Sequence, residues 1–189
     1  MKIIHKDNLP NISLPLPIYH SVHIADAIAK DGAEFDIFIG LPKQYVEQLK
    51  KLSLDKSDAE LQDNTGDRER FGKGSYEEWY NKNRTPFSLV HKQNDTLAAL
   101  VWFGPRPLFT GGNNWHTIGW RAYKPFRGKG LMKVFTQFSI DFYKENVPNI
   151  KLWIASEKDN LSSRKLAQDL GFQVSEEVSE DNSIIMVKE

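Results

Sequence analysis

The chain has 189 residues, and 40% of them are hydrophobic, which suits a single domain with a core of its own. Its 25 basic and 25 acidic residues give a formal net charge of zero, which argues against a general nucleic-acid binder. Cysteine is absent, which excludes disulfides, thiolate metal sites and a cysteine nucleophile.

The first fifty residues give a mixed pattern. Prolines interrupt residues 9–17, and the segment Ser21–Lys30 is predicted to form a short helix. Alternating apolar residues predict a strand over Phe35–Ile39. Residues Leu41–Leu52 place apolar side chains on one face and carry Pro42 in the first turn, which predicts an amphipathic helix.

Residues 53–74 are polar and contain several glycines, so we predict a mobile loop or lid there. Within this segment, Ser57 followed by Glu60 has the spacing that caps a short helix. Ser75 followed by Glu78 has the same spacing and predicts a second helix start, directly before an aromatic cluster.

The pattern is sharper from residue 86 onward. It predicts three strands, then a helix, a strand, a second helix and a closing hairpin, at residues 87–91, 97–103, 115–123, 131–145, 151–155, 160–170 and 173–187. Turns are expected at 92–95, 111–114 and 180–182, and Gly119 suggests a bulge or a close backbone approach in the third strand. The order β-β-β-α-β-α-β-β, after an α/β N-terminal lead-in, predicts a mixed α/β sheet in one domain over 1–189.

The most informative segment joins the third strand to its helix. Residues 123–132 read Tyr-Lys-Pro-Phe-Arg-Gly-Lys-Gly-Leu-Met, with two glycines, several cations and no acid. Backbone N–H groups at a helix start are unpaired and the helix dipole adds positive charge, so an anion, most often a phosphate, is the expected occupant. A solvated, charged face is the plainer alternative.

The known nucleotide motifs do not fit this turn. A P-loop needs glycine at position 123, where Tyr123 stands, and a dinucleotide fingerprint needs glycine at position 133, where Lys133 stands. The five histidines show no metal-binding spacing, so no metal site is expected.

Residues 127–132 instead resemble the pyrophosphate-binding signature of the GNAT superfamily of N-acetyltransferases, Arg/Gln-x-x-Gly-x-Gly/Ala. Arg127 and Gly130 match it, and Met132 replaces the final small residue. The family's second landmark, an asparagine followed by Gly-Phe, matches Asn160 and Gly171-Phe172 in spacing and order. The resemblance is clearest over 86–189. Each half of the second landmark also fits a plain helix cap.

The resemblance implies acetyl-CoA as the acetyl donor, with its pyrophosphate on the N–H groups of the turn and its pantetheine arm between two splayed strands. The cofactor-binding residues that it implies are Ala122, Tyr123, Arg127, Gly128, Lys129, Gly130, Leu131, Met132, Lys133, Asn160 and Ser163. Lys129 and Lys133 are expected to reach phosphate oxygens, and a bulge at Gly119 would suit the splay.

The implied reaction is direct attack of an amine on the thioester, assisted by a base and a strand N–H. Many family members protonate the leaving thiolate with a tyrosine, but this chain has Ala167 at that position, and Ser163 is a speculative substitute. His116 is the predicted base because its strand carries no acid, and His91 is a weaker candidate.

The acceptor is expected to be an amine of a small molecule or a protein. Two alternatives are open for the aromatic residues: they line an acceptor pocket or they belong to the core, and the residues concerned are Trp79, Tyr80, Trp102, Trp115 and Trp120. We expect a cytoplasmic monomer or homodimer with no nucleic-acid or membrane partner, because no apolar run approaches the length of a membrane span and the N-terminus has no signal-peptide pattern. The alternatives are a weak or inactive GNAT-like CoA-binding or regulatory module, and an unrelated α/β protein with a phosphate turn.

Overall fold

The computed structural model of the chain describes residues 1–108, 112, 114–176, 179 and 182–189. Its strands are β1 (Lys2–His5), β2 (Ser21–Ile28), β3 (Glu34–Gly40), β4 (Thr85–His91), β5 (Thr96–Pro105), β6 (Trp115–Ala122), β7 (Lys151–Glu157), β8 (Gln173–Val174) and β9 (Ser183–Lys188). Its helices are α1 (Lys43–Leu54), α2 (Ala59–Asn64), the π-helix η1 (Arg68–Lys73), α3 (Tyr76–Tyr80), α4 (Met132–Asn146) and α5 (Leu161–Asp169).

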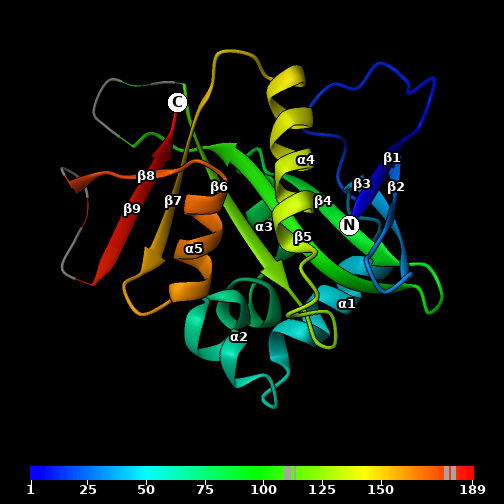
Figure 1. Ribbon diagram of the computed structural model, residues 1–189, viewed down its shortest axis with the longest axis horizontal. Helices are drawn as coiled ribbons and strands as arrows, with labels where there is room; N and C mark the ends of the chain where they lie inside the picture. Colours follow the sequence, from blue (N-terminus) through cyan, green and yellow to red (C-terminus); the bar gives the residue numbers. More distant parts are fainter. Residues whose placement is uncertain (109–111, 113, 177–178, 180–181) are drawn as a thin grey trace.

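The strands of the described residues form one sheet in the order β1-β2-β3-β4-β5-β6-β7-β9-β8 (Figure 1). Every neighbouring pair is antiparallel except β6 and β7, which are parallel. Because β6 and β7 are parallel, the chain crosses over between them through α4. The predicted order β-β-β-α-β-α-β-β and the mixed α/β sheet are therefore confirmed.

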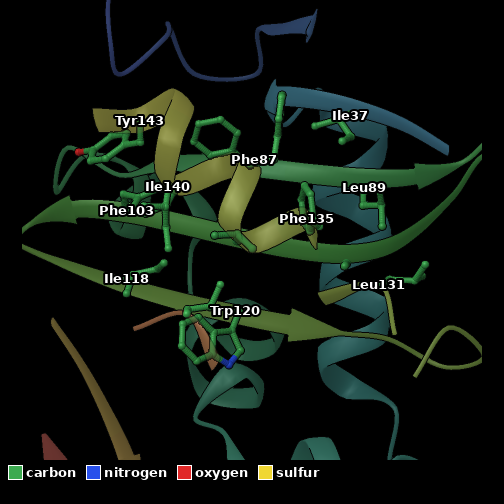
Figure 2. Packing of buried hydrophobic residues seen from close by; sticks show 14 of the residues in the cluster. Ile37, Phe87, Leu89, Phe103, Ile118, Trp120, Leu131, Phe135, Ile140 and Tyr143 are labelled. Atoms are coloured by element: carbon green, nitrogen blue, oxygen red, sulfur yellow. The ribbon is translucent and has the colours of Figure 1, made fainter. Parts of the chain in front are cut away.

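Two apolar cores cover the two faces of the sheet. On one face α4 lies across β4, β5 and β6, and Figure 2 shows Phe135 and Ile140 of this helix over the strands that carry Phe87, Phe103 and Ile118. On the other face Leu49 of α1 and the aromatic residues of α3 pack in one cluster with Val90 of β4 and with Leu97, Leu100 and Trp102 of β5. None of the described helices has the length and apolar character that a membrane crossing requires.

The prediction of a helix at Ser21–Lys30 is wrong. Residues Ser21–Ile28 form β2, which pairs with β1 on one side and β3 on the other. Pairing on both sides satisfies the backbone hydrogen bonds of this segment, so sheet formation overrides a pattern compatible with a short helix.

The segment 53–74, predicted as a loop, contains α2 and η1. The N-cap of α2 is Asp58 and not Ser57, since the Asp58 carboxylate accepts a hydrogen bond from the Leu61 N–H at 3.2 Å. The capping box at Ser75 is confirmed, because Ser75 accepts a bond from the Glu78 N–H at the start of α3. Whether this segment is mobile stays a prediction.

The bulge suggested at Gly119 does not occur, because β5 and β6 keep one register from Ala99–Ala122 to Pro105–His116. The register shift lies one strand earlier, between Leu89 and Val90. Of the predicted turns, 111–114 and 180–182 lie largely outside the described residues. The closing hairpin is present as β8 and β9, although β8 is shorter than predicted.

Candidate functional site

Strands β6 and β7 separate soon after they meet. Their pairing covers only Trp115–Lys151 to Thr117–Trp153, while β7 continues to Glu157 in its ladder with β9. The split predicted between these two strands is thus present, and it widens toward the end of β6.

The alternation of β6 shows which of its backbone groups face this split. Trp115 accepts a bond from the Arg106 N–H at 3.1 Å, and the Tyr123 N–H donates to Ala98 at 2.9 Å, so the odd-numbered residues of β6 bond to β5. The even-numbered residues Trp120 and Ala122 therefore direct their N–H and C=O groups toward β7, beyond the point where the two strands part.

The turn after β6 presents backbone donors at the start of α4. Gly128 and Gly130 have φ angles of 75° and 68°, a conformation that favours glycine. A Cβ built on Gly128 has no heavy atom within 4 Å, so the space beside it is open. The N–H groups of Gly128 to Met132 have no hydrogen-bond partner among the residues that the structure describes. Such a turn fits an anion.

A cavity of about 270 Å³ opens beside this turn, and we name it the turn cavity. Six residues that the sequence assigned to the cofactor line it: Ala122, Arg127, Gly128, Met132, Asn160 and Ser163. Its opposite wall comes from α2 and the residues after it, including Glu60, Leu61, Asn64 and Thr65.

A larger cavity of about 640 Å³, which we name the split cavity, continues from the turn cavity between β6 and β7. The two share Asn64, Thr65, Trp120, Arg121, Asn160 and Ser163. Trp79, Trp102 and Trp153 also line the split cavity. The described residues thus form one connected space that runs from the turn along the split.

Comparison with known families shows which family the chain belongs to. The sequence profile of the Acetyltransferase (GNAT) family matches residues 52–172, which is more than half of the chain.

The chain belongs to the GNAT acetyltransferase family.

Solved structures agree with this membership at the level of the fold. The GNAT domain of S. lividans PAT superposes with a TM-score of 0.66 at 13% identity, covering 86% of this chain and 94% of that one. RimL, a ribosomal L7/L12 α-N-protein acetyltransferase in complex with coenzyme A, gives 0.59 at 16% identity over 80% and 93%. Spermidine N-acetyltransferase from Vibrio cholerae, in complex with CoA and spermine, gives 0.61 at 14% identity over 80% and 92%. A comparison with curated proteins finds no match.

Arg127, the first residue of the GNAT signature, is bound to α2. Its Nη1 and Nη2 atoms lie 2.5 and 2.6 Å from the two carboxylate oxygens of Asp58, and its Nε donates to the Ala122 carbonyl at 2.7 Å. Burial would raise the pKa of the Asp58 carboxyl, but the Arg127 guanidinium and the Leu61 N–H outweigh burial and the pKa is lowered. Arg127 therefore fixes the turn against α2, with its guanidinium already paired.

Five residues predicted to bind the cofactor do not line the turn cavity: Tyr123, Lys129, Gly130, Leu131 and Lys133. Tyr123 is fully buried, its N–H donates to Ala98 and its carbonyl accepts from Phe126, so its backbone is not available to a ligand, and its buried hydroxyl has no hydrogen-bond partner among the described residues. Lys129 lies 3.5 Å from Asp31, while Lys133 is exposed at the first turn of α4.

The second GNAT landmark serves as helix caps in this chain. Asn160 accepts a bond from the Ser163 N–H at 3.1 Å and so caps α5, while it also lines both cavities. Gly171, at a φ of 85°, ends α5, and the Phe172 N–H donates to the Ala167 carbonyl. Ala167 is buried and its side chain is a methyl group. The position that carries a tyrosine in many family members therefore has no proton donor in this chain.

His116 lies outside both cavities. Its Nδ1 atom is 2.8 Å from the Tyr143 hydroxyl of α4, on the helix-covered face of the sheet. Burial lowers the pKa of His116, and the nearby Arg84 charge lowers it further. This position does not suit the predicted role as base, and the carboxylates among the described lining residues of the split cavity are Asp63 and Glu157.

The lowered pKa of His116 predicts a pH dependence of stability. Because the folded state releases this proton more readily than the unfolded chain, whose histidine pKa is about 6.5, the unfolded state binds more protons below that pH. Stability should therefore fall as the pH drops through about 6.5. Urea unfolding between pH 5 and 8 should show a weaker pH dependence in His116→Gln, whereas equal slopes in both proteins would contradict this prediction.

Several residues of the site gave no signal in the sequence. The carboxylate of Asp67, just before η1, has no exposed surface and pairs with Arg121 at 2.6 and 2.9 Å and with Arg70 at 3.1 Å. Arg121 also donates to the Trp120 carbonyl at 2.7 Å, within the split. The Asp67–Arg121 pair joins residues 54 positions apart in the sequence, and no local pattern marks it.

Gly119 is required because Trp102 packs on it. A Cβ at residue 119 would lie 2.3 Å from Cζ2 of the Trp102 ring, so Gly119→Ala must displace a wall of the split cavity. We expect a loss of about 1–3 kcal/mol in the free energy of unfolding, measured by urea denaturation. Gly66→Ala is the matched control, since it lines the same cavity and a Cβ there meets nothing within 4 Å. Equal stability of the two variants would contradict the prediction.

Proposed function

We propose that the chain is an N-acetyltransferase that transfers an acetyl group from acetyl-CoA to an amine. The observation that carries this proposal is the turn of unpaired N–H groups at Gly128–Met132, which opens into a cavity continuous with the split between β6 and β7. A diphosphate needs several convergent donors with no side chain in the way, and this turn fits that need.

The lining of the two cavities indicates which residues would hold acetyl-CoA. The N–H groups at Gly128 and Met132, the two residues of the segment Gly128 to Met132 that line the turn cavity, would bind the pyrophosphate, and Asn160 and Ser163 would line the passage into the split. Arg127 is a positioning residue, since its guanidinium is bound to Asp58. The roles predicted for Lys129 and Lys133 toward phosphate oxygens stay predictions.

Acetyl-CoA would supply the acetyl group, which leaves sulfur for the amine nitrogen while the amine loses one proton and the sulfur gains one. The N–H groups that Trp120 and Ala122 direct into the split are the candidate donors to a carbonyl oxygen. Asp63 or Glu157 would take the proton of the ammonium. Ser163 is the candidate proton donor in place of the tyrosine, because its position touches both cavities.

Thermal unfolding with acetyl-CoA, followed by a thiol-release assay with amines, tests this function. Acetyl-CoA at a concentration 100 times its Kd should add about 2.7 kcal/mol to the free energy of unfolding. An amine acceptor should then cause the release of CoA. Stabilisation by acetyl-CoA without thiol release in the presence of any amine would favour the second candidate, a CoA-binding module. The observation that favours this candidate is the buried Ala167 at the position of the tyrosine. Absence of any stabilisation would reject both candidates.

A further inference from the structure

The split cavity carries an excess of positive charge although the whole chain is neutral. Five cationic side chains line it: Arg70, Lys82, Arg84, Arg106 and Arg121. Asp63 and Glu157 are the acidic residues among its described lining residues. The cations are therefore concentrated at this site.

The buried carboxylate of Asp67 neutralises only part of this charge. It pairs with both Arg70 and Arg121. Lys82, Arg84 and Arg106 form no ion pair with any residue that the structure describes. Three lining cations are thus left for a ligand.

Arg84 is one of these three cations, and its guanidinium is partly buried at the cavity wall. Its Nε and Nη1 atoms are buried, and neither has a hydrogen-bond partner among the described residues. Burial lowers the pKa of Arg84, and the charges of Arg106 and Arg70 lower it further. Unpaired buried donors cost free energy, and a guanidinium recognises carboxylate or phosphate by its fork of N–H groups.

Neighbouring residues hold Arg84 and Arg106 in place at one end of the cavity. The Arg106 guanidinium lies 5.0 Å from the centre of the Trp153 ring, and the Trp153 indole N–H donates to the Arg106 carbonyl at 2.8 Å. Arg84 packs against Gly104, where an added Cβ would lie 2.7 Å from its Nη1 atom. Both arginines are therefore held by neighbouring groups at the cavity wall.

These arginines are far from the glycine turn. Arg84 precedes β4 and Arg106 follows β5, and the register places these ends beside Thr117, where β6 and β7 are still paired. Five residues of β6 separate Thr117 from Ala122, a distance of about 17 Å along the strand. A pyrophosphate on the turn would not reach Arg84, so a different anion is needed at this end.

We propose that the acceptor is an amine that also carries a carboxylate or phosphate group, and that Arg84 and Arg106 bind this group. The inference rests on the proposed acetyl transfer and names its substrate class. The anionic group would lie at the closed end of the split, which leaves the amine free to face the thioester. The same charges disfavour a polycation, in contrast to the Vibrio cholerae structural relative, which was solved with spermine.

Matched pairs of acceptors test the proposal by thiol release. L-Alanine and L-alaninamide share an amine and differ in the carboxylate, while phosphoethanolamine and ethanolamine differ in the phosphate. We expect kcat/KM to be at least tenfold higher for the anionic member of one pair or both, and the pair that responds identifies the anion. Equal or better use of the members that lack the carboxylate or phosphate, or of spermidine, would overturn the proposal.

Variants then assign the preference to the arginines. Arg84→Gln and Arg106→Gln should raise the KM of the preferred acceptor at least tenfold and leave the KM of acetyl-CoA unchanged. Lys165→Gln removes one exposed positive charge outside both cavities and should change neither constant. Thermal melts check that each variant folds. A preference that survives in both arginine variants would overturn the proposal.

A binding measurement separates this inference from the proposed function. With CoA present, N-acetyl-L-alanine or inorganic phosphate should raise the Tm of the wild-type protein and not that of Arg84→Gln. This result, with no amine acetylated, would reject the transferase function and keep the anion site. Equal shifts in both proteins, or no shift in either, would reject the anion site itself.

Discussion

Replacing Asp67 by alanine is expected to lower the free energy of unfolding by about 3–5 kcal/mol, because it removes one partner of a buried ion pair. The Asp67 carboxylate has no exposed surface and holds both Arg121 and Arg70. Without it, the largely buried Arg121 guanidinium, whose side chain is 18% exposed, loses its charge partner while it stays beside the split cavity. A chain of this size should lose roughly 10 °C or more in Tm.

Glu69→Ala is the matched control for this experiment. Glu69 lies two residues further on, within η1, and pairs with Lys73 at 2.6 Å, but both side chains are more than half exposed. Exposed pairs of this spacing contribute only about 0.3–0.5 kcal/mol. Thermal and urea unfolding of both variants should therefore differ clearly. A loss below about 1 kcal/mol in Asp67→Ala would show that Arg121 finds another partner and would contradict this account.

The elements that the sequence predicted well are those with a strong apolar period and a local boundary signal. The helix after the glycine turn has its apolar stripe and becomes α4, and Pro42 and Ser75 start helices where the pattern places them. The errors fall where long-range pairing decides. The segment Ser21–Ile28 becomes β2 because β1 and β3 lie on both sides of it, which no window of the sequence shows.

The candidate site was predicted only in part, for the same reason. Gly128 and Asn160 were found because a motif marks them, and both line the turn cavity. Arg127 was found too, but its partner Asp58 lies 69 residues away in a polar segment without periodicity. The arginines of the split cavity come from several elements, so their convergence follows from the topology of the sheet.

Asn160 and Gly171 show that a capping role and a family motif are compatible. Each residue has the hydrogen bonds of an ordinary helix cap, and the chain nevertheless belongs to the GNAT family. A cap fixes where α5 begins and ends, and the beginning of α5 lines both cavities through Asn160 and Ser163. The cap therefore contributes to the site by setting the position of a helix end.

Gly128→Glu is expected to weaken CoA binding at least 100-fold, which is the largest effect on function that we predict. Gly128 has a φ of 75°, lines the turn cavity and has open space where a Cβ would stand. A glutamate there would fill that space and place a negative charge where the pyrophosphate is proposed to bind. The strained backbone would cost a further 1–2 kcal/mol or so. Isothermal titration with CoA measures the loss.

Gly32→Glu separates this effect from strain and charge. Gly32, between β2 and β3, has a φ of 86° with nothing within 4 Å of an added Cβ, and it lines neither the turn cavity nor the split cavity. Gly32→Glu therefore imposes the same backbone cost and the same new charge, and CoA affinity should stay within about twofold of wild type.

If both variants bind CoA equally well, the pyrophosphate does not lie at Gly128, because only one of them changes the surface of the turn cavity. If both lose CoA binding equally, the loss comes from destabilisation of the fold, and thermal melts of the two variants would show it.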